Sequence, residues 1–98
     1  MHTLEIERAA IEKDWHARGF SCGMWIDHAG HAWNDTIHET DELFLVLAGD
    51  LEIEIAGRCI RPRIGEEILI PAQVPHRVRN VGHRTARWLY GKRTGDLS

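Results

Sequence analysis

"DTIHETDELFLVLAG", residues 35–49, places a histidine and several acids directly ahead of six apolar residues and a glycine. Two interpretations are open: a polar turn leads into a buried strand, or some of these polar residues are metal ligands at the start of that strand. The run from Leu43 to Ala48 is apolar on both faces, and in an antiparallel sheet both faces of such a strand are covered. Because one small barrel covers only its inner face, the run predicts a homodimer in which a second subunit covers the outer face.

The residues after this stretch predict short strands separated by turns, the pattern of an all-β fold. "LEIEI" at 51–55 alternates strictly, with three apolar residues on one face and two glutamates on the other. Gly49-Asp50 ahead of it predicts a tight hairpin, because glycine accepts the positive φ that such turns need. Ala56-Gly57 predicts the next turn.

The second half of the chain continues the pattern. "HRVRNV" alternates from residue 76, so His76 and Val78 point the same way. A last strand is predicted over 85–90, followed by polar residues to the end of the chain. The front of the chain leaves two alternatives, because residues 8–15 fit a short helix with Ile11 and Trp15 on one side, whereas residues 3–7 fit a strand.

Composition indicates one small globular domain over residues 1–98, with a core barrel over about 20–91 and a polar tail at 92–98. The net charge of −3 argues against nucleic acid and anionic membranes as partners. Residues 1–57 carry a net charge of −9 and residues 58–98 one of +6. In a fold that interleaves the two halves, these charges pair across strands or between subunits, or they are scattered and solvated.

The N-terminus has no apolar signal region and no run is long enough to span a membrane, so a cytoplasmic protein is expected. Cys22 and Cys59 form no CxxC pair, and we expect both to be reduced thiols in the core or in a pocket. Glu66 and Glu67 follow a turn and are expected to be solvated.

Two spaced patterns carry the chemistry. Gly30, Thr36, His38, Glu42 and Gly49 follow the spacing G-x5-T-x-H-x3-E-x6-G. Further along, a second set follows G-x5-P-x-Q-x2-H-x3-N: Gly65, Pro71, Gln73, His76 and Asn80.

In these patterns the sequence resembles the cupins, whose two motifs run G-x5-H-x-H-x3-4-E-x6-G and G-x5-P-x-G-x2-H-x3-N. The resemblance covers residues 30–91 and implies a double-stranded β-helix, the jelly-roll-like antiparallel barrel, with a short helical or extended segment ahead of it. It implies a metal site made by His38, Glu42 and His76. Thr36 stands where the family has its first histidine, and Gln73 stands at the glycine of the second motif.

Two imidazoles and one carboxylate with open positions suit a divalent ion such as iron, manganese, nickel or zinc. The resemblance thus implies a metal-dependent enzyme of dioxygenase or isomerase type acting on a small molecule. The alternative is a metal-free binding or sensor module that uses the same cavity, which Thr36 favours. The opposing interpretation of the histidines is that they are hydrogen-bonded core residues.

Other residues near the motifs are weaker candidates for a role in the pocket or the metal site. Thr36 and Trp33 are expected to line the pocket. For Trp25, Trp88 and Tyr90 two interpretations are open, a pocket wall for an aromatic or sugar-like ligand or the core, and the core is favoured. His28 and His31 are expected to be solvated loop residues rather than a substitute for the missing histidine. Asn80 is expected to satisfy backbone groups at a turn.

Overall fold

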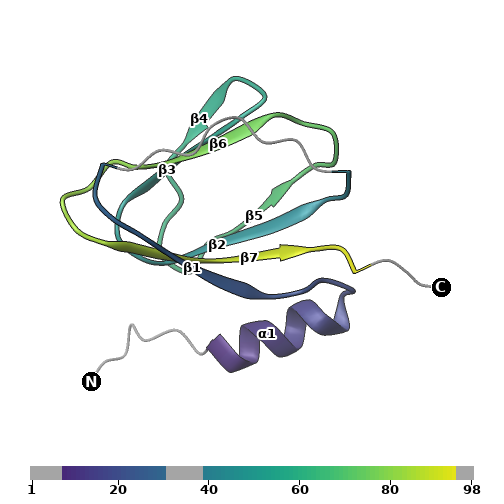
Figure 1. Cartoon of the computed structure of the whole chain (residues 1–98). Coiled ribbons are helices and arrows are strands. Elements are labelled where there is room, and N and C mark those ends of the chain that lie inside the picture. Colours follow the sequence, from purple (N-terminus) through teal and green to yellow (C-terminus); the bar gives the residue numbers. More distant parts are fainter. Residues whose placement is uncertain (1–7, 31–38, 95–98) are drawn as a thin grey trace.

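The computed structural model describes residues 8–30 and 39–94. It contains one helix, α1, and seven strands, β1 to β7 (Figure 1). Their bounds are α1 Arg8–Ala17, β1 Gly23–Asp27, β2 Glu42–Ala48, β3 Leu51–Ile55, β4 Arg58–Ile60, β5 Glu67–Ile70, β6 His76–Asn80 and β7 Ala86–Lys92. The N-terminal alternative is therefore settled as a helix for residues 8–17, while residues 3–7 lie outside the described part. No helix in the described residues is both long and apolar enough to cross a membrane.

The strands form two antiparallel sheets that face each other. One sheet has the order β1-β7-β2-β5 and the other the order β4-β3-β6. Figure 1 shows the two sheets as separate layers, with α1 packed under the four-stranded one. The all-β, jelly-roll-like prediction is confirmed, although the described strands form an open pair of sheets rather than one closed barrel.

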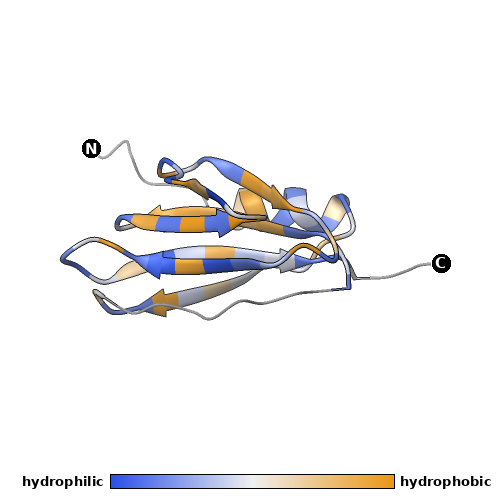
Figure 2. Ribbon diagram, turned by 90° about the horizontal axis from the view of Figure 1, so that it is seen from above, coloured by the Kyte–Doolittle hydropathy of each residue, from blue (hydrophilic) through white to orange (hydrophobic). Residues whose placement is uncertain are grey.

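The core between the sheets follows from strand alternation. In β3, Leu51 and Ile53 are buried and the glutamates between them are more exposed, as "LEIEI" predicts. In β6, Val78 is buried together with His76 and Asn80, which lie on the same face. Figure 2 shows this alternation as changes of hydropathy along the strands. Buried residues in this core are Phe44, Val46, Leu51, Ile53, Ile70, Val78, Ala86 and Trp88.

The turn prediction at Gly49-Asp50 is wrong in one respect. Gly49 has the expected positive φ of 95°, but β2 and β3 do not pair, because β2 lies in the four-stranded sheet and β3 in the three-stranded one. The turn therefore carries the chain from one layer to the other. The local pattern could not distinguish a hairpin from this crossing, because both need the same turn residues.

The turn prediction at Ala56-Gly57 is confirmed. β3 and β4 form an antiparallel hairpin in which Ile55 pairs with Arg58 across two turn residues. Both turn residues have positive φ, 51° at Ala56 and 83° at Gly57, which is the backbone of a type I′ turn. Ala56 is strained there, because the left-handed region brings Cβ close to the following carbonyl oxygen.

Both faces of β2 are covered largely by residues of the same chain. Phe44 and Val46 face the core between the sheets, whereas Leu43 and Leu45 face the other way. That outer face is covered by the helical segment, in a second cluster of Trp15, Phe20, Leu43, Leu45 and Leu89. Burial of this strand therefore does not require a second subunit, and the homodimer stays a prediction.

The close approach of α1 to the sheet depends on a glycine in β7. Trp15 is fully buried, and a Cβ added at Gly91 would lie 2.7 Å from Cε3 of Trp15 and 2.2 Å from the Ser21 carbonyl oxygen. Any larger residue at 91 would push the helix segment off the sheet. The outer face of β7 is thus shaped to receive Trp15.

The oppositely charged halves of the chain pair across strands, as one of the alternatives predicts. On the outer face of the three-stranded sheet, Arg77 lies 3.5 Å from Glu54, and Arg79 forms an ion pair with Glu52. Both pairs join directly opposed residues of β3 and β6. These exposed pairs contribute little stability each, roughly 0.2–1 kcal/mol, but they favour the observed register.

Glu67 is exposed, as predicted, but it also has partners that the sequence did not indicate. Arg18 donates to both of its carboxylate oxygens, over 3.0 and 2.7 Å, and the Trp15 indole donates to Oε1 over 3.1 Å. The Arg18 hydrogen bond holds the pKa of Glu67 below its ordinary value. The contact joins the end of α1 to the start of β5, residues that are 49 positions apart in the chain.

Candidate functional site

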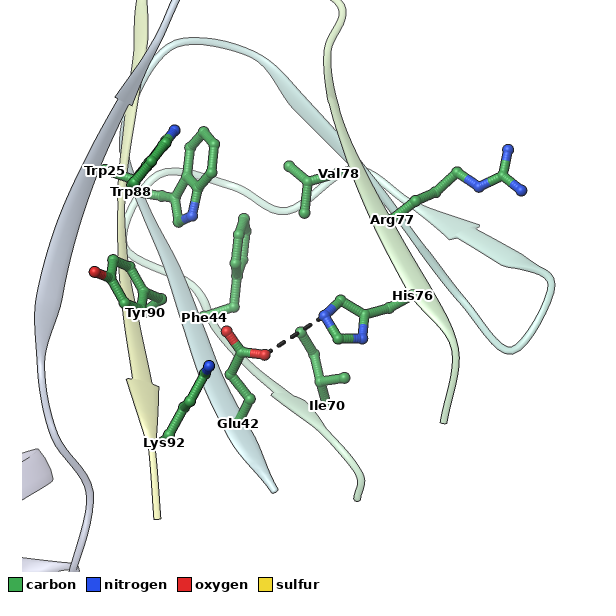
Figure 3. Close-up of a pocket in the computed structure, with 10 residues that line it drawn as sticks. All are labelled: Trp25, Glu42, Phe44, Ile70, His76, Arg77, Val78, Trp88, Tyr90 and Lys92. Atoms are coloured by element: carbon green, nitrogen blue, oxygen red, sulfur yellow. Dashed lines mark ion pairs between the residues drawn. The ribbon is translucent and has the colours of Figure 1, made fainter. Parts of the chain in front are cut away.

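A cavity of about 270 Å³ opens between the two sheets. Figure 3 shows the side chains around it, which come from both sheets. Its lining residues are Trp25, Glu42, Phe44, Ile70, His76, Arg77, Val78, Trp88, Tyr90 and Lys92. Most of this lining is apolar, and the polar groups are few, which is the usual make-up of a small-molecule site.

The register between β2 and β7 determines which side chains form the wall on the side of the four-stranded sheet. Three pairs of opposed residues alternate along the two strands: Glu42 with Lys92, Phe44 with Tyr90, and Val46 with Trp88. Since every second residue of a strand points to the same face, all three pairs point toward the other sheet. From that sheet, β6 contributes His76 and Val78 to the opposite wall.

Glu42 and His76 meet across the gap between the sheets. His76 Nε2 lies 3.4 Å from Glu42 Oε1, and the two side chains are only 7% and 9% exposed. Figure 3 marks this contact with a dashed line. They come from different sheets and are far apart in the chain, so the fold itself creates the pair.

The orientation of the His76 ring is set by its other nitrogen. Nδ1 lies 3.3 Å from the Val74 carbonyl oxygen. Because a carbonyl oxygen only accepts, this hydrogen bond places a proton on Nδ1 and directs Nε2 toward Glu42. A backbone carbonyl that fixes the ring in this way is the usual support of a metal-binding histidine.

The two donor atoms have a spacing that fits one shared ion. Nitrogen and oxygen ligands lie about 2.0–2.2 Å from ions such as zinc, in tetrahedral or wider coordination. Two ligands at such distances and about 90–110° apart are roughly 3.0–3.5 Å from each other. The Nε2 to Oε1 distance of 3.4 Å lies within that range. The chemistry and the spacing of Glu42 and His76 therefore fit a divalent ion.

The remaining predicted site residues are not all described. His38, Thr36 and Trp33 lie outside the described residues, as does His31. Within 8–30 and 39–94, no group of three or more histidine, cysteine, aspartate or glutamate side chains is placed to hold a metal. The structure thus brings together two of the three predicted ligands, and their metal-binding role stays a prediction. His28 is exposed and is not among the cavity-lining residues.

The aromatic residues of the cavity are the main part of the site that sequence reasoning missed. Trp88 belongs to the core as expected, but it also lines the cavity together with Trp25 and Tyr90. Phe44 completes this wall, with its ring centroid 5.7 Å from that of Trp88. The signal was present in β7, where Trp88, Tyr90 and Lys92 alternate and therefore share one face.

Two other motif residues have structural roles. Asn80 is fully buried, donates to the Arg84 carbonyl over 2.9 Å and accepts from the Gly82 amide over 3.0 Å, which confirms the turn-closing role expected of it. Gln73 has a φ of +66°, a conformation that glycine adopts without strain. The second motif therefore keeps its backbone bend although Gln73 replaces the glycine.

The cysteines take no part in the cavity. Cys22 and Cys59 are both free thiols, as expected. The expected position in the core or in a pocket is wrong for Cys59, which is exposed, while Cys22 is half-buried, and neither is a lining residue. Burial raises the pKa of the Cys22 thiol, which keeps it protonated and weakens it as a nucleophile.

Comparison with known proteins agrees with the fold. Residues 24–91 match the family model described as "Cupin domain". Over 69 residues the chain is 32% identical to "Polyketide synthase CurC" of Streptomyces cyaneus, a match that covers 69% of this chain and 45% of the relative. The chain thus spans less than half the length of that relative.

Solved structures show the same fold at low sequence identity. An oxalate oxidase in complex with glycolate superposes with a TM-score of 0.72 at 23% identity, covering 83% of this chain and 45% of the other. A salicylate 1,2-dioxygenase from Pseudaminobacter salicylatoxidans superposes with a TM-score of 0.71 at 17% identity, covering 76% of this chain and 22% of the other.

Proposed function

Because this chain belongs to the cupin family, we propose that it is a metal-dependent cupin that acts on a small organic molecule in the cavity between its sheets. Glu42 and His76 hold a divalent ion at one end of that cavity. His38 supplies the third ligand, a role that rests on the spacing of the first motif. The metal is iron, manganese, nickel or zinc, since all four accept imidazole and carboxylate ligands.

The buried Glu42 and His76 pair carries this proposal. A carboxylate and an imidazole that are removed from water need partners that compensate the lost hydration. The donor atoms of Glu42 and His76 have a spacing that fits one shared ion, and the Val74 carbonyl holds the ring with Nε2 directed toward Glu42. Most of the other lining side chains are aromatic or aliphatic, so electrostatic interactions at the pair are stronger than in water.

A bound divalent ion would act as a Lewis acid toward an oxygen atom of the ligand. The chain itself contributes the orientation of Nε2, the exclusion of water by Phe44 and Trp88, and a carboxylate that accepts a proton or a metal bond. The names of three similar proteins support a ligand rich in oxygen, since they refer to a polyketide, to oxalate and to salicylate.

The test is the metal content per chain, measured by elemental mass spectrometry on tag-free protein. We expect near-stoichiometric metal in the wild type and loss of most of it in His38→Ala, Glu42→Gln and His76→Ala. His83→Ala is the matched control, because His83 is exposed and does not line the cavity. Thermal unfolding in the presence of chelator shows whether each variant still folds.

A second candidate is a metal-free binding module, and one observation favours it. Glu42 and His76 are close enough to form an ion pair directly, and that pair compensates both groups without an ion if the histidine is protonated. A folded wild type that stays empty after incubation with iron, manganese, nickel and zinc would establish this alternative and exclude the metalloenzyme.

A further inference from the structure

The cavity has two chemically different ends, which the strand register explains. Trp88 of β7 lies at one end, and Phe44 and Tyr90, which are opposed on β2 and β7, follow it. The next opposed pair is Glu42 and Lys92, so the charged wall residues from these two strands lie at the other end. A ligand that fills such a cavity has a flat apolar body and a polar group at one end only.

Lys92 is the cation that faces this space. Its side chain lines the cavity beside Glu42 and Tyr90 (Figure 3). Arg77 also borders the cavity, but its side chain points away from it in Figure 3 and pairs with Glu54 on the outer face. Among the described residues, therefore, Lys92 is the positively charged side chain available to a ligand inside the cavity.

We propose that the cavity selects a flat, conjugated molecule of one or two rings that carries an oxyanion, and that Lys92 is the residue that recognises the charge. This inference rests on the proposed function, because the same cavity holds the ligand, but it does not depend on the metal. The ring system lies between Phe44, Trp88 and Tyr90. The oxyanion lies beside Lys92 at the end that also holds the Glu42 and His76 pair.

The size and lining of the cavity agree with this ligand class. A volume of about 270 Å³ equals the space of on the order of nine water molecules, which suits one or two rings rather than a long chain. Aromatic walls favour a flat π-system through offset or edge-to-face contacts. A lysine ammonium at the mouth adds a charge-assisted hydrogen bond that a neutral ligand of the same shape does not form.

The position of Tyr90 in the cavity wall depends on the small size of Gly23. Tyr90 is opposed to Gly23 of β1, and a Cβ added at Gly23 would lie 2.7 Å from Cζ and 2.8 Å from Oη of Tyr90. These atoms are the tip of a side chain that is able to move. Gly23→Ala therefore displaces the Tyr90 ring and changes the shape of the cavity without changing its charge.

The experiment compares 2-naphthoate with its neutral isostere 2-naphthamide by isothermal titration calorimetry. Wild type, Lys92→Met and the matched control Lys13→Met are titrated as purified and again after chelator treatment, and the metal content of each sample is measured. Met keeps the apolar stem of lysine, and Lys13 is an exposed residue of α1. We expect wild type to prefer naphthoate by about tenfold, the scale of one charge-assisted contact.

Lys92→Met is expected to remove this preference by weakening naphthoate alone, and Lys13→Met is expected to keep it. Gly23→Ala is expected to weaken both probes alike. Equal affinities of wild type for the two probes, binding of neither, or a preference that survives in Lys92→Met would each overturn the inference. A wild type that holds no metal as purified or after incubation with iron, manganese, nickel and zinc, and that still shows the Lys92-dependent preference, would support the inference while refuting the metal proposal.

Discussion

Replacement of Trp15 by alanine tests whether α1 acts as the cover of the four-stranded sheet. Trp15 is fully buried and packs with Leu43, Leu45 and Leu89 on the outer face of that sheet. Its indole also donates a hydrogen bond to Glu67 over 3.1 Å. The variant removes the largest buried side chain of the helix and leaves the apolar outer face of β2 and β7 open to water.

The expected loss is large relative to the stability of such a domain. Trp→Ala at a buried position costs about 3–5 kcal/mol, and the lost hydrogen bond to a partly exposed carboxylate adds roughly 1 kcal/mol. A domain of this size has a free energy of unfolding of about 5–15 kcal/mol. Trp15→Ala is therefore expected to lose about 4–6 kcal/mol of the free energy of unfolding, which is roughly a quarter or more of the total.

Urea unfolding followed by far-UV circular dichroism measures this loss. Trp15→Phe separates the two contributions, because it keeps an aromatic ring and removes the donor, and it is expected to lose about 1–2 kcal/mol. Trp25→Ala is the matched control, since Trp25 is 39% exposed and its removal is expected to cost less than 2 kcal/mol. A loss below 2 kcal/mol for Trp15→Ala would refute the role of α1 as a cover.

Three further predictions concern the backbone and the helix contact. Gln73→Gly is expected to raise the free energy of unfolding by about 0.5–1 kcal/mol, because glycine adopts the φ of +66° at this position without strain; an unchanged urea midpoint would contradict this. Ala56→Asn places an Asn-Gly pair in the type I′ turn, where Asn tolerates positive φ better than Ala, and is expected to gain a similar amount in thermal unfolding. The pKa of Glu67 is held below its ordinary value of 4.5 by Arg18, so the stabilisation from this pair is fully present above about pH 4.5 and is lost as the pH falls through the folded-state pKa. Glu67→Gln is therefore expected to have a lower free energy of unfolding than wild type at pH 7. On acidification its free energy of unfolding is expected to fall less than that of wild type; parallel curves of this free energy from pH 7 to pH 3 would show that the pair contributes nothing.

Much of the fold follows from local patterns in the sequence. The alternation in 51–55 and 76–80 fixed which side chains face the core, because side chains in a strand alternate with a period of two. The turn at Ala56-Gly57 followed from residue types that accept positive φ. The two spaced motifs identified the family and selected Glu42 and His76, which the structure places 3.4 Å apart.

Other features needed the tertiary structure, because they depend on which strands become neighbours. The turn at Gly49 joins two different sheets rather than a hairpin, and the same residues serve either geometry. The cover of β2 comes from α1, whose position depends on the room that Gly91 leaves for Trp15. Glu67 reaches Arg18 only because β5 lies at the edge of the sheet that α1 covers.

The sequence by itself determined the all-β architecture, the faces of the strands and two residues of the polar end of the cavity. Only the tertiary structure decided that aromatic side chains from β1, β2 and β7 line one cavity and that Lys92 lies opposite Glu42. The physical reason is that strand periodicity is local, whereas register and sheet order arise from packing between residues far apart in the chain.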